Sequence, residues 1–171
     1  MKNRSEIAKE IAENAIYRME ESLRMISMST KLLSVEELWK KPNDASNSIG
    51  NLIIHLKGNI TQYMLAGLGG QEDDRDRDLE FSENYGYTAK ELNLQLDELL
   101  EQVKRLLHNV GDSELTKKQT VQGFNLSGYG IILHVVEHLS YHTGQIALWT
   151  KIIKNKDLGF YKGFDLNIKN K

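Results

Sequence analysis

Proline is scarce in this sequence, and its scarcity limits the folds that the chain can adopt. Pro42 is the only proline in 171 residues. Because proline breaks helices and is common in the turns of loop-rich folds, the sequence favours long, uninterrupted helices. Apolar residues also repeat at the helical period in four segments, about residues 4–33, 47–68, 88–111 and 127–153. Four amphipathic helices around one core predict an all-α fold, a four-helix bundle.

Capping signals mark the expected helix boundaries. The predicted N-caps are Ser34 for a short turn, Asn47 or Ser48 for the second long helix, Thr88 for the third, and Ser127 or Gly128 for the fourth. Glu37 and Glu91 follow Ser34 and Thr88 by three residues, which is the spacing of a capping box. Gly111 is expected to end the third helix.

The connecting segments differ in character, and residues 1–171 together predict one domain. Residues 71–87 form a polar loop, and we expect its charged stretch at 72–78 to be solvated. Residues 112–126 lack a helical rhythm and predict a long connection with a short extended piece at 119–121. The tail at about 154–171 is polar but contains Phe160, Tyr161 and Phe164. We expect it either to fold back over the bundle or to pair with another subunit.

Charge and cysteine content exclude several classes of protein. The net charge is −2 and Lys and Arg form no block, so nucleic acid is not an expected partner. The chain has no cysteine, so nitrogen and oxygen must hold any transition metal. No apolar run is long enough to span a bilayer, and the N-terminus has no apolar signal-peptide core. We expect a cytoplasmic protein, unless a leader has been removed.

Histidines are concentrated in the fourth predicted helix. Three of the five in the chain, His134, His138 and His142, are spaced four residues apart, so their rings lie along one side of a helix. His55 lies in the middle of the second predicted helix. Imidazole is the commonest metal ligand in proteins. Two ligands one turn apart and a third from another helix can form an open three-histidine site.

A polar stripe on the second predicted helix supports this interpretation. Asn51, His55, Asn59 and Gln62 are spaced by four, four and three residues on an otherwise apolar helix. Buried polar side chains are costly unless they are hydrogen-bonded. The three amides, and Gln145 three residues after His142, are therefore candidates to orient the ligating rings or to hold a water molecule.

Less specific interpretations of the same residues remain open. His134 could be a ligand, a hydrogen-bonding neighbour, a pocket-lining group or a core histidine, because three consecutive turns do not readily reach one tetrahedral ion. His108 is expected to be exposed near the end of the third helix. Glu137 and Glu83 are candidate carboxylate ligands or bases, but Glu137 is rotated by about 100° from His138 and suits a surface position.

Two stretches of the sequence resemble the DinB-like (DinB/YfiT) superfamily of small bacterial metalloproteins. They are residues 48–56 (SIGNLIIHL) and 133–146 (LHVVEHLSYHTGQI), and the second resembles the family's His-x-x-x-His-(Arg)-Gly-Gln-Ile signature. The resemblance implies an up-down-down-up bundle with a long crossover, and a divalent metal held by His55, His138 and His142. It also implies homodimers. Thr143 departs from the pattern, because the family often has Arg there. If that Arg binds an anionic substrate or a thiol cofactor, the departure implies a different substrate or a loss of activity.

We therefore expect a metal-dependent enzyme that activates water or a low-molecular-weight thiol, such as a thiol-dependent transferase or a related hydrolase acting on a small molecule. Zinc or nickel suits imidazole ligands, and iron or manganese is compatible. His134, Asn51 and Asn59 are candidate assisting groups. The alternatives are a non-catalytic, metal-binding or stress-related dimeric bundle, and a bundle whose histidines are only hydrogen-bonded.

Overall fold

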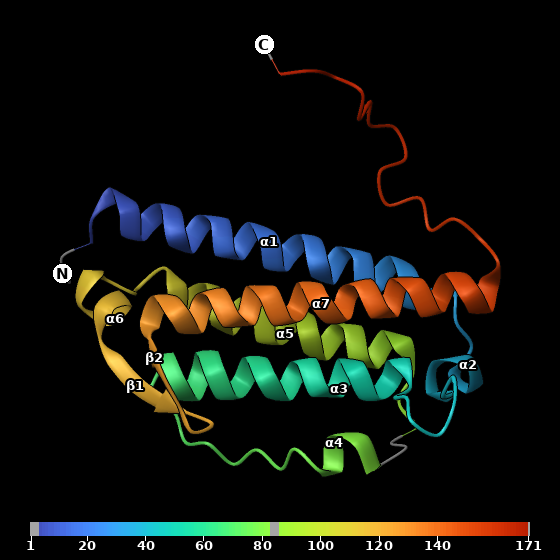
Figure 1. Cartoon of the computed structure of the whole chain (residues 1–171), viewed down its shortest axis with the longest axis horizontal. Coiled ribbons are helices and arrows are strands. Elements are labelled where there is room, and N and C mark those ends of the chain that lie inside the picture. Colours follow the sequence, from blue (N-terminus) through green and yellow to red (C-terminus); the bar gives the residue numbers. More distant parts are fainter. Residues whose placement is uncertain (1–3, 83–85, 171) are drawn as a thin grey trace.

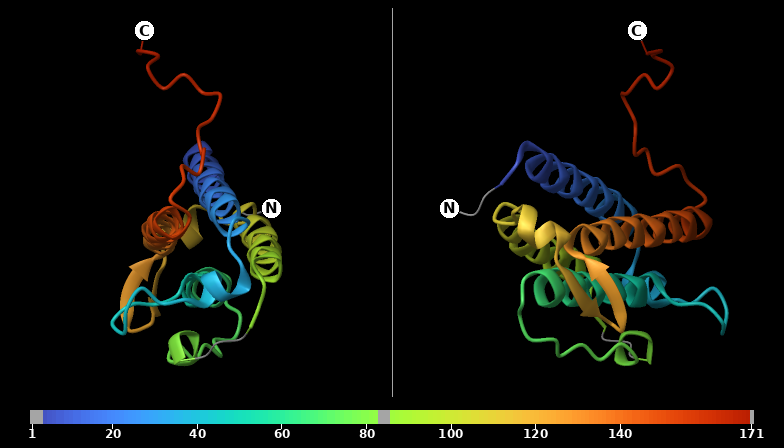
Figure 2. Two further views of the ribbon diagram at one scale, coloured as in Figure 1. Left: turned by 90° about the vertical axis from the view of Figure 1, so that its right-hand side faces the viewer. Right: turned by 60° about the vertical axis from the view of Figure 1, so that its left-hand side comes forward.

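Four long helices lie side by side in the computed structural model, which describes residues 4–82 and 86–170 (Figure 1). They are α1 (Glu6–Thr30), α3 (Ile49–Ile60) with its continuation η1 (Thr61–Leu68), α5 (Ala89–Leu107) and α7 (Gly128–Lys154). Helix α1 packs against α5 and α7, and α3 packs against the same two helices. The two views of Figure 2 show the same arrangement from other sides.

The helices follow an up-down-down-up order. Helices α1 and α7 run in one direction, whereas α3 and α5 run in the opposite direction (Figure 1). Because α3 and α5 are parallel, residues 69–88 must return along the length of the bundle, and this crossover contains the short helix α4 (Leu79–Ser82). The predicted all-α four-helix bundle and its long crossover are confirmed.

The apolar faces of the four helices meet in one core. Large side chains that are almost completely buried come from every long helix, among them Met19, Ile26, Leu56, Tyr63, Leu107 and Ile131. Burial of this apolar surface is the main favourable contribution to folding. Within the described residues, no helix combines the length and the apolar composition that a bilayer crossing requires.

Most of the predicted caps are present. Ser48 caps α3 by accepting from the backbone N–H of Asn51, and Ser127 caps α7. The capping boxes that begin at Ser34 and Thr88 open α2 (Val35–Trp39) and α5. The predicted end of the third helix at Gly111 is wrong, because α5 ends at Leu107 and the exposed His108 is its C-cap.

The connection at 112–126 contains more regular structure than the sequence predicted. Gly111 precedes the one-turn helix α6 (Asp112–Thr116). Strands β1 (Lys118–Val121) and β2 (Phe124–Ser127) then form an antiparallel hairpin, which includes the predicted extended piece. Gln122 and Gly123 form its turn with φ angles of 51° and 83°, which glycine adopts readily.

The second half of the predicted second helix is a π-helix. The N–H of Gly69 donates to the carbonyl of Met64, five residues earlier, at 2.8 Å. Gly67 lies in this segment, where an added Cβ would come within 2.7 Å of Val121 on β1. The hairpin therefore packs closely on η1. The apolar periodicity did not predict this change of helix type, since π-helical segments continue the same run of residues.

The C-terminal tail folds back only in part. Leu158 is buried, and Arg24 on α1 donates to the carbonyl oxygen of Phe160 at 3.1 Å. The chain then projects away from the bundle (Figure 1). Three apolar side chains on this projecting segment are more than two-thirds exposed, namely Phe164 (73%), Leu166 (70%) and Ile168 (77%).

Candidate metal centre

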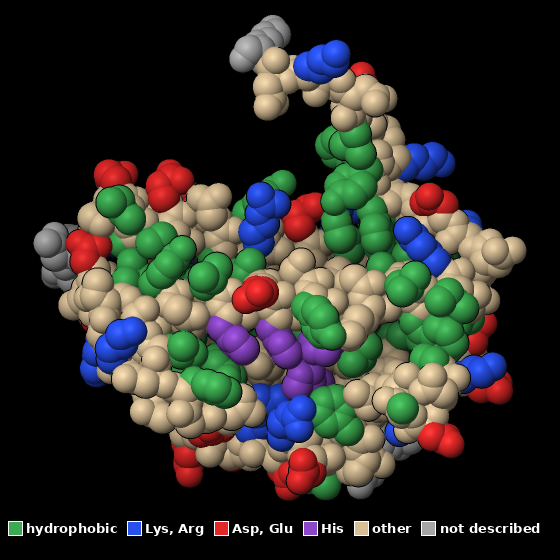
Figure 3. All heavy atoms as spheres, in the orientation of Figure 1, with side chains coloured by type: hydrophobic (Ala, Val, Ile, Leu, Met, Phe, Trp, Pro, Cys, Tyr) green, Lys and Arg blue, Asp and Glu red, His purple; other side chains and the backbone are tan. Residues whose placement is uncertain are grey.

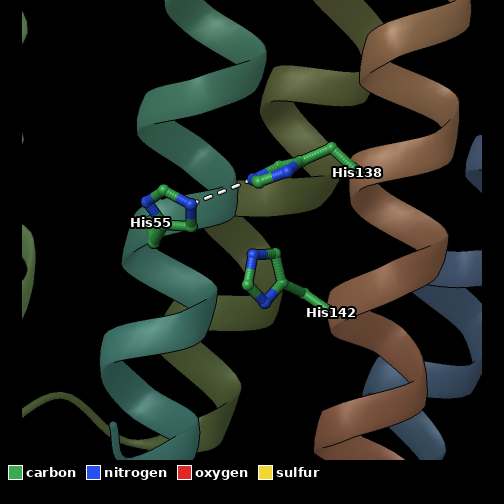
Figure 4. A group of neighbouring side chains, drawn as sticks. All are labelled: His55, His138 and His142. Atoms are coloured by element: carbon green, nitrogen blue, oxygen red, sulfur yellow. Dashed lines mark hydrogen bonds between the residues drawn. The ribbon is translucent and has the colours of Figure 1, made fainter.

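Three histidine rings from two antiparallel helices face one another. His55 comes from the middle of α3, and His138 and His142 come from consecutive turns of α7 (Figure 4). The Nε2 atoms of His55 and His138 are 2.9 Å apart. One nitrogen of each ring lies within 4.8 Å of the others. A tetrahedral ion with bonds of about 2.0–2.1 Å needs its nitrogen ligands about 3.3 Å apart, so these side chains fit a shared cation.

Hydrogen bonds fix which nitrogen of two rings is available. Nδ1 of His142 lies 2.7 Å from Oε1 of Gln145, and Nδ1 of His55 lies 2.8 Å from Oε2 of Glu80. Both partners are oxygen acceptors, so each Nδ1 carries the proton and each Nε2 keeps its lone pair. The tautomers therefore suit metal binding through Nε2. Gln145 makes the kind of contact that the sequence predicted for it.

The site favours neutral imidazoles. Burial, together with the neighbouring rings of His142, His55 and His134 and the charge of Arg75, lowers the pKa of His138 to about 3. Burial also lowers the pKa of His142, although its hydrogen bond to Gln145 opposes this effect. Neutral imidazole is the form that ligates a metal, so His138 and His142 are ready to bind a cation at neutral pH.

A buried ion pair supports His55 from the crossover. Arg75 donates from Nε and Nη2 to the two carboxylate oxygens of Glu80, at 2.7 and 2.9 Å. The two side chains are 6% and 7% exposed. Burial raises the pKa of Glu80, but the hydrogen bonds from Arg75 and His55 outweigh it and leave the pKa below its usual value. Glu80 is therefore a carboxylate that accepts the Nδ1 proton of His55.

Neither member of this pair was predicted as a site residue from the sequence. The expectation that residues 72–78 are solvated is wrong for Arg75, which is turned inward against α3 together with Glu80 from the polar loop that follows. Gly58 makes room for them, because a Cβ at that position would clash with the carboxylate of Glu80. The available signal was His55 itself, since a buried imidazole needs a partner for its second nitrogen. Nothing in the pattern of the loop indicates which charged residue supplies it.

The remaining predicted amides have different roles. Gln62 accepts from Nη1 of Arg75 at 2.8 Å, so it supports the ion pair and not a histidine ring. Asn51 accepts from Ser48 at 2.6 Å and donates to the carbonyl oxygen of Glu80 at 3.0 Å. It thereby joins the start of α3 to the segment that carries Glu80.

His134 lies beside the three-histidine cluster and is not part of it. Its ring stacks on Tyr63 with centroids 4.1 Å apart and on His138 with centroids 5.5 Å apart. Nδ2 of Asn59 lies 3.4 Å from Nε2 of His134. Glu137 is exposed, as its rotation from His138 predicted. The other carboxylate candidate, Glu83, lies outside the described residues.

The fold and the three converging imidazoles define a four-helix bundle with a candidate metal site. The chain belongs to the family described as "Protein of unknown function (DUF1572)", whose model matches residues 6–162. No curated protein sequence matches it.

Solved structures share the fold at low sequence identity. YfiT from Bacillus subtilis, described as a probable metal-dependent hydrolase with an unusual four-helix bundle topology, is 16% identical with a TM-score of 0.71, over 90% of this chain and 94% of that chain. A DinB-like protein from Bacillus cereus is 16% identical with a TM-score of 0.67, over 84% and 91%. Another from Bacillus subtilis, YjoA, is 16% identical with a TM-score of 0.66, over 86% and 96%.

Proposed function

We propose that this protein is a metal-dependent enzyme whose ion is held by His55, His138 and His142. The observation that carries the proposal is the convergence of one nitrogen from each ring within 4.8 Å. Neutral imidazoles leave the full charge on the cation, and three protein ligands are typical of catalytic sites that keep a position open for substrate. The description of YfiT as a probable metal-dependent hydrolase supports the same class of function.

Imidazole ligands suit zinc or nickel, and iron or manganese is compatible with the same donors. A bound ion supplies Lewis acidity, which polarises a substrate carbonyl or lowers the pKa of water or a thiol. The reaction that we propose is hydrolysis, or the transfer of a low-molecular-weight thiol to a small electrophile. In either case the chain must orient the substrate and accept a proton.

Residues beside the three ligands can perform these steps. Burial lowers the pKa of His134, although the charge of Glu137 opposes this, so the ring is neutral and able to accept a proton at neutral pH. Oδ1 of Asn59, whose Nδ2 lies beside the ring of His134, is a buried acceptor with no hydrogen-bond partner among the described residues. Asn51 acts at a distance, through the segment that holds Glu80.

Thr143 does not replace the arginine that the family pattern has at this position. Its hydroxyl donates to the carbonyl oxygen of Leu139 at 2.7 Å, and the side chain is buried. The cation nearest to the described cluster is instead Arg75, whose Nη2 lies 3.2 Å from Nδ1 of His55. Because Glu80 neutralises that guanidinium, we propose that the protein acts on a substrate without a strong negative charge.

Metal content tests the proposal. Protein purified without an affinity tag is expected to bind about one equivalent of zinc or cobalt, and His138→Ala is expected to lose this binding while its far-UV circular dichroism is retained. The helices survive because core packing, and not the ion, supplies most of their stability. His108→Ala is the matched control, since His108 is exposed at the end of α5.

The same sample distinguishes an enzyme from a non-catalytic metal-binding protein. The visible spectrum of the cobalt form is expected to change when a small thiol such as 2-mercaptoethanol is added, because an open position admits it. An unchanged spectrum would favour the non-catalytic bundle. Equal metal affinity in His138→Ala and in the unaltered protein would refute the ligand assignment.

We also propose that the protein forms a homodimer. Tyr129, Leu133 and Tyr141 are large apolar side chains exposed on α7. An adjoining hollow of about 300 Å³ between α1 and α7 is lined mainly by apolar residues. Exposed apolar patches of this kind mark protein interfaces.

A further inference from the structure

We propose that a pocket next to the three histidines binds an uncharged alkyl or aryl part of the substrate. This inference rests on the proposed metal-dependent function and names the kind of substrate that the site takes. The pocket has a volume of about 340 Å³ and lies between the start of α3, the C-terminal half of α7 and the segment that follows Pro42. Leu52, Leu148, Trp149 and Ile152 supply its apolar wall.

The pocket continues the line of the metal site along α7. Gln145, Trp149 and Ile152 follow His142 by three, seven and ten residues, so they lie on the same side of the helix. Trp149 is two turns from His142, about 10 Å along the axis. On α3, Leu52 precedes His55 by three residues. A molecule in the pocket can therefore extend along both helices to the three rings.

Figure 3 shows the same relation on the surface. The histidine side chains are visible in the middle of this face, between α3 and α7. Hydrophobic side chains gather to their right, over the C-terminal half of α7.

Gln145 belongs both to the candidate metal site and to the pocket. Its Oε1 accepts the hydrogen bond from His142, and its side chain lines the pocket. A substrate that fills the pocket therefore lies against the residue that orients a metal ligand. This contact gives a physical connection between the recognition of the substrate and the position of the His142 ring.

The chemistry of the wall selects the ligand. Among the residues that the structure describes, no charged side chain lines the pocket, and Ser46, Asn47 and Gln145 are its polar members. By contrast, the hollow between α1 and α5 is lined by several Glu, Asp, Arg and Lys side chains. A charged group would lose hydration in the α3–α7 pocket without gaining a partner, whereas an apolar group gains by leaving water.

The size of the pocket limits the ligand further. Ligand sites commonly occupy about 300–1,000 Å³, so this pocket is at the lower end of the range. It suits a short alkyl chain or a single aromatic ring. Leu148 (60%) and Ile152 (59%) are exposed at its edge. Such exposure of apolar side chains beside a catalytic site is expected where a substrate covers them.

Hydroxamates of increasing chain length test this proposal, because their head group binds metal ions and their tail is uncharged. Calorimetry would measure acetohydroxamate, butyrohydroxamate, hexanohydroxamate and octanohydroxamate with the zinc-loaded protein. We expect affinity to rise about fourfold for each methylene that enters the pocket. Leu148→Glu is expected to abolish this rise. Leu94→Glu is the matched control, because Leu94 is similarly exposed (55%) on α5.

The outcomes separate the two proposals. If acetohydroxamate binds but longer chains bind no better, the pocket does not receive an apolar group and the inference fails. If Leu94→Glu reduces the chain-length effect as much as Leu148→Glu, the effect does not arise in this pocket. If Leu148→Glu instead changes the molecular mass in solution, with no chain-length effect in the unaltered protein, a second copy covers the pocket. If no hydroxamate binds the zinc-loaded protein, the proposed function itself fails.

Discussion

At the scale of single residues, Glu80 controls how His55 is presented to a cation. Its carboxylate holds the Nδ1 proton of His55 and is itself held by Arg75. Removing the charge while keeping the shape isolates this role. We expect Glu80→Gln to weaken zinc binding about 10- to 100-fold, the range found when a hydrogen-bond partner of a ligating histidine is lost. Competition with a chromogenic chelator would measure the change.

If Glu80 served only the stability of the fold, Glu80→Gln would not change the arrangement of the metal ligands. The visible spectrum of the cobalt form reports the position of the ligands, and we expect it to shift in Glu80→Gln while the circular dichroism stays the same. Glu137→Gln is the matched control, because Glu137 is an exposed carboxylate next to His138 in sequence. Unchanged zinc affinity in Glu80→Gln would show that the contact to His55 does not serve the metal.

The low pKa of His138 predicts a pH dependence of stability in metal-free protein. The pKa is about 3 in the folded state and 6.5 when unperturbed, so between these values the unfolded chain binds more protons. The free energy of unfolding should therefore fall as the pH drops from 6.5 toward 3. In His138→Gln we expect that slope to decrease by up to about 1.4 kcal/mol per pH unit. Urea unfolding in chelator would measure it, with His108→Gln as the control.

Sequence reasoning reached the histidines but not their supporting residues. The spacing of His138 and His142 places both rings on one side of α7 whatever the surroundings, because the helical repeat alone determines it. The position of His55 opposite them came from the family resemblance, since no local rule aligns two separate helices. Arg75 and Glu80 were missed because the path of a long crossover depends on tertiary contacts that periodicity does not report.

At the scale of elements, the N-terminal cap of α3 affects both the free energy of unfolding and the candidate metal site. The hydroxyl of Ser48 accepts from the N–H of Asn51 and donates to its side-chain oxygen at 2.6 Å, and the residue is buried. We expect Ser48→Ala to lower the free energy of unfolding by about 1–2 kcal/mol. It should weaken metal binding less than Glu80→Gln does, because Asn51 donates to the backbone carbonyl of Glu80, whereas the carboxylate of Glu80 accepts from His55. Denaturant titration of the metal-free protein would measure the first effect.

A second N-cap serine provides the control for that experiment. Ser34 caps the five-residue helix α2 through the N–H of Glu37, in a hydrogen bond that is exposed to solvent. Ser34→Ala should therefore cost clearly less stability than Ser48→Ala. Equal losses would mean that burial of the cap at α3 adds nothing, and that the connection from Ser48 to the crossover is not stabilising.

At the scale of the whole molecule, the fold was largely predictable because it depends on helix length and apolar rhythm. Two elements were harder to predict, namely the hairpin of β1 and β2 and the π-helix η1. The hairpin packs closely on η1, where Gly67 leaves space for it, and local sequence does not report such a tertiary contact. The assembly lies beyond local rules altogether. The homodimer that we propose would depend on which apolar surface a second copy covers, and both α7 and the projecting tail expose such surface.

The dimer and the pocket occupy different parts of α7, and this separation allows the two proposals to be tested independently. Leu133 is exposed near the hollow between α1 and α7, on the far side of the histidines from Leu148. We expect the unaltered protein to have twice the chain mass of 19.6 kDa in sedimentation equilibrium, and Leu133→Glu to reduce it to one chain. Zinc binding should be retained, because one chain supplies all three ligands. A monomeric unaltered protein would refute the dimer. A Leu133→Glu variant that remains dimeric, while Leu148→Glu dissociates, would place the interface at the exposed leucine of the pocket.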